Sequence, residues 1–115
     1  MGLRGLIFAR RRWANRVIRK AGFPRRSREA KLLLDLLVRA SKRDPKDLPK
    51  SEQVLFAALR MFHSQAAIAR MAETLQVSRV DAENALARLP NAAIAIATEK
   101  RMEQFVDVAN RIHFL

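Results

Sequence analysis

Apolar residues recur at helical spacing along almost all of this 115-residue sequence, and this pattern favours helical folds. Read at about 100° per residue, the apolar side chains of residues 3–20 fall within one broad arc, which Arg10 interrupts. Gly22 and then Pro24 follow, a combination that commonly ends a helix. We therefore predict an amphipathic helix over residues 3–20, with an apolar side made of Leu3, Leu6, Ile7, Trp13, Ala14, Val17, Ile18 and Ala21.

Serine residues mark the expected starts of the next helices. The second helix should begin at Ser27, a favourable N-cap residue, and run to about Arg43. A loop with two prolines then leads to Ser51, where a third helix is expected to begin. The apolar phase shifts near Ser64, so the pattern allows two interpretations. Either the third helix ends there and a new one begins, or it continues to Leu75.

The rest of the chain predicts two more helices. Ser78 is followed by Asp81, the shorter-acid form of a capping box, and Pro90 should end the helix that begins there. The last helix is expected over about residues 92–112. The alternation within residues 93–97 would also suit a strand, but a lone strand has no partner. The predicted fold is all-α, a small bundle of about five helices with an N-terminal basic amphipathic helical arm.

Positive charge is concentrated at the start of the chain. The net charge is +12, and residues 1–28 hold ten cations and no anion, whereas residues 29–115 hold 13 cations and 11 anions. Nine of the ten cations are arginines, whose planar guanidinium pairs with phosphate oxygens and also stacks on bases. This asymmetry divides the chain into an Arg-rich basic arm, residues 1–28, and a single helical domain, residues 29–115.

The arm is the candidate nucleic-acid-binding site. Its cations would neutralise several phosphates of RNA, and the release of counterions would drive binding without reading the base sequence. Trp13 would serve either as a platform on which a base stacks or as an anchor on a neighbouring protein. The predicted contacts are Arg4, Arg10, Arg11, Arg12, Trp13, Arg16, Arg19, Lys20, Arg25, Arg26 and Arg28.

Residues 67–86 carry a second pattern that points to nucleic acid. Small and apolar residues fall at the spacing of a helix-turn-helix motif, with Ser78 at the usual cap of the second helix, and these residues are Ala72, Leu75, Val77, Ala82 and Leu86. The segment resembles the helix-turn-helix family, which implies DNA binding. Gln76 stands at the turn position that usually holds glycine, and Asp81 and Glu83 would face DNA phosphates. A plain helical hairpin fits the same pattern.

Residue types needed for catalysis or metal binding are scarce. The chain has no cysteine, which excludes disulfides, thiolate metal sites and a cysteine nucleophile. His63 and His113 lie fifty residues apart, and the three glycines cannot form a phosphate-binding loop. The stretches without charge fall far short of the roughly 20 apolar residues that cross a bilayer. We therefore expect no enzyme activity, no cofactor and no metal site.

The basic arm and the nearly neutral body suggest three functions. The first is a structural RNA-binding component of a large ribonucleoprotein, specifically a mitochondrial ribosomal protein on the matrix side. Its arm would contact the phosphate backbone of rRNA and its body would pack on neighbouring proteins. An Arg-rich, acid-free amphipathic start is also typical of mitochondrial presequences, which is the basis for this location.

Two alternatives use other surfaces. One is an accessory subunit of a mitochondrial inner-membrane complex, such as ATP synthase or a respiratory complex. Its arm would lie on an anionic membrane surface, with Leu3, Leu6, Ile7 and Trp13 in the interface. The other is a DNA-binding regulator that uses the helix-turn-helix-like segment.

Overall fold

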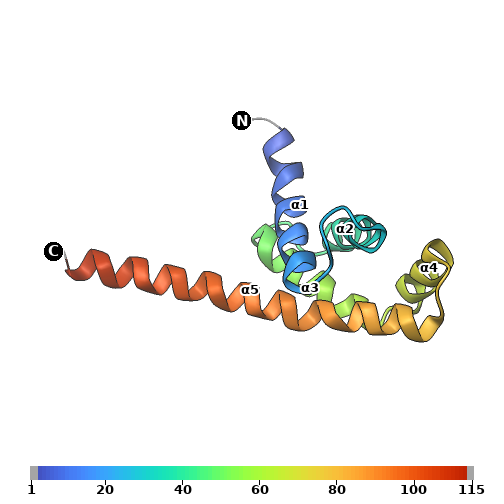
Figure 1. Ribbon diagram of the computed structural model, residues 1–115. Helices are drawn as coiled ribbons and strands as arrows, with labels where there is room; N and C mark the ends of the chain where they lie inside the picture. Colours follow the sequence, from blue (N-terminus) through green and yellow to red (C-terminus); the bar gives the residue numbers. More distant parts are fainter. Residues whose placement is uncertain (1–2, 114–115) are drawn as a thin grey trace.

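Five α-helices make up residues 3–113, the part of the chain that the computed structural model describes (Figure 1). Side chains are described for residues 9–112. In chain order the helices are α1 (Leu3–Lys20), α2 (Arg28–Ser41), α3 (Lys50–Met61), α4 (Gln65–Leu75) and α5 (Arg79–His113). Residues 3–113 contain no strand, so the predicted all-α fold of about five helices is confirmed.

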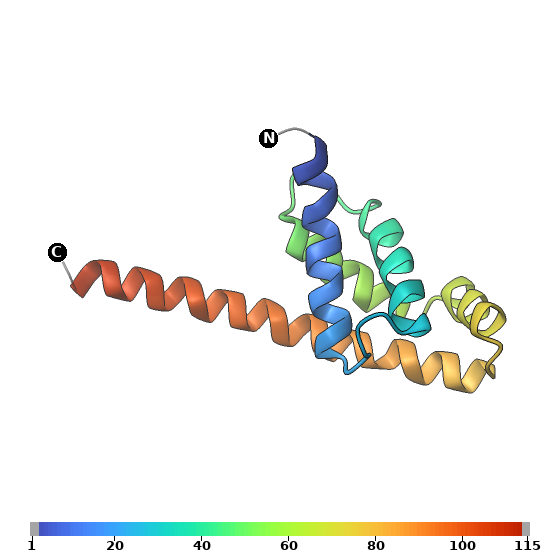
Figure 2. The ribbon, with the colours of Figure 1, turned by 45° about the horizontal axis from the view of Figure 1, so that its top comes forward.

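α5 is the longest element, and the other helices are arranged along it. α1 and α3 pack against α5, α2 packs across α1 and α3, and α4 folds back beside the start of α5 (Figure 1, Figure 2). The C-terminal part of α5 extends away from the bundle (Figure 1). This extension gives a radius of gyration of 15.8 Å, against about 13 Å for a compact chain of this length.

All five helices contribute side chains to one continuous core. Leu33 and Leu37 of α2 and Leu86 and Leu89 of α5 are fully buried. Burial of a side chain of this size contributes about 1.5–3 kcal/mol to folding. The buried apolar set is Ala14, Val17, Ile18, Phe23, Leu33, Leu37, Val54, Ala57, Ala58, Met61, Ala67, Ile68, Met71, Ala82, Leu86, Leu89, Ala92, Ala93 and Ile96.

Three serines cap helices through their side chains. Ser27 Oγ accepts a hydrogen bond from the backbone N–H of Ala30 at 3.1 Å, and Ser78 Oγ accepts one from Asp81 at 3.1 Å. Both caps were predicted from the sequence. Ser64 Oγ accepts from the N–H of Ala67 at 3.2 Å. Of the two interpretations of residues 51–75, the break near Ser64 is therefore the one observed.

Gly22 ends α1 as predicted. Its φ is +91°, in the left-handed region that glycine adopts without a Cβ clash. The N–H of Gly22 donates to the carbonyl of Arg19 at 3.0 Å, and the N–H of Phe23 donates to that of Ile18 at 3.2 Å. These two bonds form a Schellman motif, and the Phe23 side chain that follows is buried in the core.

The predicted start of the third helix is wrong by two residues. α3 begins at Lys50 with Pro49 as the N-cap residue, so Ser51 lies inside the first turn. The carbonyl of Pro49 accepts hydrogen bonds from Glu52 and Gln53, both at 3.0 Å. Proline is tolerated at this end because the N–H it lacks would have no partner there.

The predicted end of a helix at Pro90 is also wrong. α5 continues through Pro90, so the two helices expected over residues 78–90 and 92–112 are one element. Proline inside a helix costs about 3 kcal/mol, because it removes a hydrogen bond and crowds the preceding turn. Leu86, Leu89 and Ala93 are buried around it, and their packing offsets this cost.

The N-terminal segment packs on the rest of the chain. Ala14, Val17 and Ile18 of α1 and the adjoining Phe23 belong to the same core as the later helices. The division into an arm of residues 1–28 and a domain of residues 29–115 stays a prediction, but the C-terminal half of α1 forms one wall of the bundle.

Candidate nucleic-acid interface

A groove of about 410 Å³ lies between the C-terminal half of α1 and the N-terminal half of α2. This volume is in the range of small-ligand sites in proteins. We call it the α1–α2 groove. Its apolar floor is made of the buried or half-buried Ile18, Phe23, Ala30 and Leu34. Its cationic rim is made of the exposed Arg12, Arg19, Arg25, Arg26 and Lys31, and the exposed Asn15 completes the lining.

The spacing of residues along α1 explains which of them line the groove. Arg12, Asn15 and Arg19 are three and four residues apart, so they share one face of the helix. The Schellman motif at Gly22 then reverses the chain, so that α2 returns along this face.

A tight turn carries two of the rim arginines. The N–H of Ser27 donates to the carbonyl of Pro24 at 3.1 Å, which closes a β-turn with Arg25 and Arg26 at its centre. Arg26 has a φ of +70°, in the left-handed region that turns usually fill with glycine or asparagine. Ser27 then caps α2, whose first two turns supply Lys31 to the rim. Three consecutive elements thus bring five cations together.

The rim is unbalanced in charge. The groove lining contains no carboxylate. Within residues 9–112, none of the five rim cations forms an ion pair or a side-chain hydrogen bond. Like charges focused on a concave surface create a positive potential that attracts anions. Phosphate suits this rim because each arginine can donate two hydrogen bonds to its oxygens.

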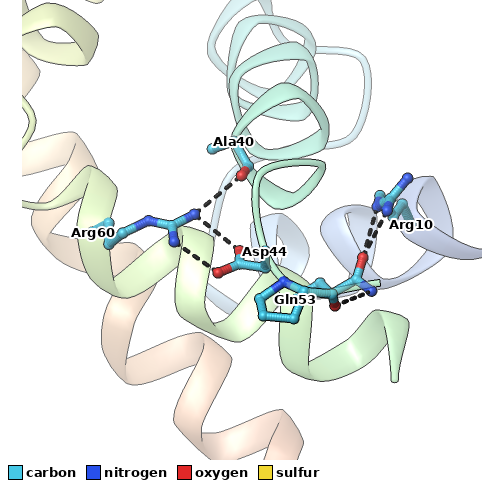
Figure 3. Close-up of polar contacts among 6 residues, drawn as sticks. Arg10, Ala40, Asp44, Gln53 and Arg60 are labelled. Atoms are coloured by element: carbon cyan, nitrogen blue, oxygen red, sulfur yellow. Dashed lines mark hydrogen bonds and ion pairs between the residues drawn. The ribbon is translucent and has the colours of Figure 1, made fainter. Parts of the chain in front are cut away.

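Arg10, another predicted contact, is held inside the chain. Its Nε and Nη2 donate to Oε1 of Gln53 at 3.0 and 2.7 Å (Figure 3). Gln53 is fully buried, and its Nε2 donates to the carbonyls of Leu48 and Pro45 at 2.8 and 3.2 Å. Arg10 therefore braces α1 against the start of α3, which explains why a cation interrupts the apolar stripe.

Arg16 and Lys20 face an acid on α5. Lys20 Nζ lies 2.7 Å from Oε1 of Glu99, and Arg16 Nη2 lies 3.8 Å from Oε2. The hydrogen bond from Lys20, its charge and the weaker effect of Arg16 lower the pKa of Glu99 below its ordinary value. These two cations are therefore partly neutralised by the fold.

Trp13 is also engaged within the chain. Arg16 Cζ lies 4.9 Å and Lys100 Nζ lies 4.6 Å from its ring centroid, both in cation–π positions. The ring is half-buried against the core. A base that stacked on Trp13 would have to displace these cations.

The remaining predicted contacts differ in their surroundings. Arg28 Nη2 donates to the carbonyl of Thr74 at 3.3 Å and so ties the start of α2 to the end of α4. Arg11 is exposed on α1. The Arg4 side chain lies outside the described residues. Of the eleven predicted contacts, the structure gathers Arg12, Arg19, Arg25 and Arg26 in one groove.

Sequence reasoning missed Lys31, which lies beyond the predicted arm. A short link between the predicted helix end at Gly22 and the predicted helix start at Ser27 favours a second helix that folds back on the first. This link was the signal in the sequence that could have placed Lys31 beside α1. It also missed the bidentate pair in which Arg60 Nη1 and Nη2 lie 2.7 and 2.9 Å from the Asp44 carboxylate (Figure 3). Arg60 additionally donates to the carbonyl of Ala40 at 3.0 Å, and the spacing of 16 residues gives no local pattern that would predict the pair.

The helix-turn-helix-like segment is a helical hairpin of α4 and the start of α5. Gln76 has a φ of +55°. It therefore adopts the left-handed conformation for which glycine is usual at the turn of a helix-turn-helix motif. Asp81 and Glu83 are exposed on the first turns of α5. DNA binding by this segment stays a prediction, and both carboxylates would oppose it.

Within the described residues, no helix is long and apolar enough to cross a membrane. Among the side chains of residues 9–112, no group of three or more histidine, aspartate or glutamate residues could hold a metal ion. No protein-family model, curated protein or solved structure matches the chain.

Proposed function

We propose that the chain is a structural RNA-binding component of a large ribonucleoprotein, specifically a mitochondrial ribosomal protein on the matrix side, with rRNA bound through its phosphates. The α1–α2 groove is the observation that supports RNA binding. Five exposed cations and no carboxylate line one concave surface, while Glu99 is committed to Arg16 and Lys20 elsewhere. The mitochondrial location rests on the presequence-like composition of residues 1–20. Since α1 supplies three core side chains, we propose that this segment is retained.

Neighbouring proteins would bind the extended part of α5. Residues 101–112 are all exposed, and Met102, Phe105, Ala109 and Ile112 follow the three-four spacing of helices that pair with other helices. Two cations and two anions balance the charge of residues 101–112, so they would not attract phosphate. A stretch of this length spans roughly 20 Å, too short to bury the about 800 Å² per partner of a stable dimer by itself. Within a large assembly other contacts would add to this area, so we propose a helix of a neighbouring protein as the partner.

Salt dependence tests the RNA contacts. Five phosphate contacts predict a slope of log affinity against log salt of about −3.5 to −4.5 for a structured RNA. Replacing Arg12, Arg19 and Lys31 together by glutamine should flatten this slope by about two to three. A matched control replaces the exposed Lys42, Arg43 and Lys46, at the other end of α2, and removes the same charge. Equal losses in both triple variants would mean that binding follows net charge and not the groove.

The identity of the assembly needs a separate experiment. The tagged full chain is purified from the cells that express it, with and without ribonuclease, and the associated RNA and proteins are identified. We expect ribosomal RNA and ribosomal proteins from mitochondria. Recovery of respiratory or ATP synthase subunits without RNA would favour the inner-membrane alternative instead.

The membrane alternative has less support on the described surface. Large hydrophobic side chains that are exposed within residues 9–112 lie on α3, on α5 and in the turns before α4 and α5, and none lies on α1 or α2. Interfacial helices need such side chains on the face that meets the lipid. The side chains of Leu3, Leu6 and Ile7 lie outside the described residues.

A further inference from the structure

The α1–α2 groove has an apolar floor that phosphate binding alone does not require. Contacts to the backbone of an RNA duplex need exposed cations, and a flat or convex surface supplies them. Here the cations surround a concavity whose lining includes Ile18, Phe23, Ala30 and Leu34. The ligand that fits both parts carries a planar, weakly polar body next to anionic groups.

We propose that the α1–α2 groove binds one unpaired nucleotide of an RNA chain. The base would lie on the apolar floor, and the phosphates on either side of it would meet the cationic rim. This inference rests on the proposed RNA binding and adds the class of RNA that is recognised. Bases in a duplex are stacked and paired, whereas bases in bulges and loops turn outward and enter protein pockets.

Two side chains of the lining fit this occupant. Asn15 stands beside the floor, and its amide offers both a donor and an acceptor to the edge of a base. Arg26 stays at the groove in a left-handed conformation that is unfavourable for arginine. Backbone strain of this kind tends to occur at binding sites.

The structure also favours this groove over Trp13 as the place for a base. The Trp13 ring already has two cations at cation–π distances, Arg16 and Lys100, whereas the Phe23 ring of the groove has one, with Arg88 Cζ 4.2 Å from its centroid. A lipid, which would also present phosphate beside an apolar chain, is disfavoured because no large hydrophobic side chain is exposed on α1 or α2 among residues 9–41.

The test compares three RNAs of equal length, which therefore have equal numbers of phosphates. They are a perfectly paired hairpin, the same hairpin with one bulged nucleotide, and an unstructured single strand. We expect the full chain to bind the bulged hairpin and the single strand about tenfold more tightly than the paired hairpin, as one stacked base supplies.

Filling the groove should remove only this preference. Ala30→Phe occupies the floor without changing any charge, and we expect its affinities for the three RNAs to become nearly equal. Asn15→Phe fills the same space from an exposed position, so it serves if Ala30→Phe unfolds the chain. Ala69→Phe, at an exposed alanine of α4, is the control and should leave the preference unchanged.

The outcomes separate this inference from the proposed function. Equal binding of all three RNAs by the unmodified chain, or a bulge preference that survives both filling variants, overturns the nucleotide site but leaves phosphate binding intact. No binding to any RNA overturns both. A further outcome is that the chain binds no RNA but pellets with cardiolipin vesicles. If the Arg12, Arg19 and Lys31 triple variant then loses this pelleting, the groove is a lipid site.

Discussion

Arg26 and Gln76 both hold a left-handed backbone conformation that disfavours residues with a side chain. Their φ angles are +70° and +55°. Gln76 ends α4, where the N–H of Val77 donates to the carbonyl of Ala72 at 3.1 Å, and it does not line the α1–α2 groove. Arg26 stands in the α1–α2 groove. The same change to glycine can therefore be made at both positions, and only the change at Arg26 is predicted to affect RNA binding.

We predict that glycine at either position stabilises the fold. The left-handed conformation costs an L residue about 1–2 kcal/mol, and the greater unfolded-state freedom of glycine removes roughly half of that gain. Arg26→Gly and Gln76→Gly should each raise the free energy of unfolding by about 0.5–1 kcal/mol in urea titrations followed by Trp13 fluorescence. Only Arg26→Gly should flatten the salt slope of RNA binding, by about 0.7–0.9. If Arg26→Gly gains stability but keeps the full salt slope of RNA binding, Arg26 is not one of the phosphate contacts.

Within residues 9–112, the ion pairs between α1 and α5 converge on one acidic residue, Glu99. Glu99 receives Lys20 at 2.7 Å and Arg16 at 3.8 Å, and the hydrogen bond from Lys20 lowers its pKa. A carboxylate whose pKa is lowered in the folded state stabilises the fold above its unfolded pKa, about 4.3, and loses this contribution as the pH falls through the folded value.

We therefore predict a pH-dependent effect of Glu99→Gln. At pH 7 the variant should unfold at a lower urea concentration than the unmodified chain, and the difference should disappear as the pH falls well below 4.3. High salt at pH 7 should also shrink it, because the pair is half-exposed. Asp107→Asn, on the extended part of α5, is the control, because its partner Arg111 lies on the same helix. A difference that persists at low pH would assign the effect of Glu99 to packing.

α5 contains a proline where its sequence predicts an end. Pro90 cannot donate a hydrogen bond to the preceding turn, and the buried residues around it keep the helix continuous. Pro90→Ala restores the donor in a half-buried position and should raise the free energy of unfolding by about 1–3 kcal/mol. A urea titration measures this difference. Loss of stability would show that the proline ring itself is needed to fill the space beside α5.

The two ends of the chain make unequal contributions to the core. The N-terminal 28 residues bury Ala14, Val17, Ile18 and Phe23, whereas residues 101–112 bury none. The three larger N-terminal side chains contribute roughly 5–9 kcal/mol, comparable to the whole stability of a small domain. We predict that a fragment of residues 29–115 loses cooperative melting by circular dichroism, and that a fragment of residues 1–100 keeps it. Cooperative melting of residues 29–115 would support the division of the chain at residue 28.

The extended part of α5 should matter for partners and not for folding. Phe105 is 69% exposed and lies in the middle of the apolar stripe. Phe105→Glu should leave the melting temperature unchanged and reduce the protein neighbours recovered with the tagged chain, while Thr98→Glu, at an exposed residue nearer the bundle, should not. A concentration-dependent dimer in sedimentation experiments, lost in Phe105→Glu, would mean that a second copy is the partner.

Local interactions made much of the secondary structure predictable. The caps at Ser27 and Ser78, the stop at Gly22 and the helical periodicity of residues 3–20 each depend on neighbours a few residues away, so the sequence displays them directly. The concentration of arginine before residue 28 is likewise visible without a structure, and it predicted four of the five rim cations.

Contacts between distant residues decided the rest. Pro90 lies inside a helix because packing outweighs the local preference of proline, and Arg10 turns inward because Gln53, 43 residues away, accepts its hydrogen bonds. Lys20 and Glu99 meet across 79 residues. The sequence by itself therefore determined where the helices and the positive charge are. Only the tertiary structure, which brings α2 back along α1, decided which cations are bound within the fold and which surround a groove.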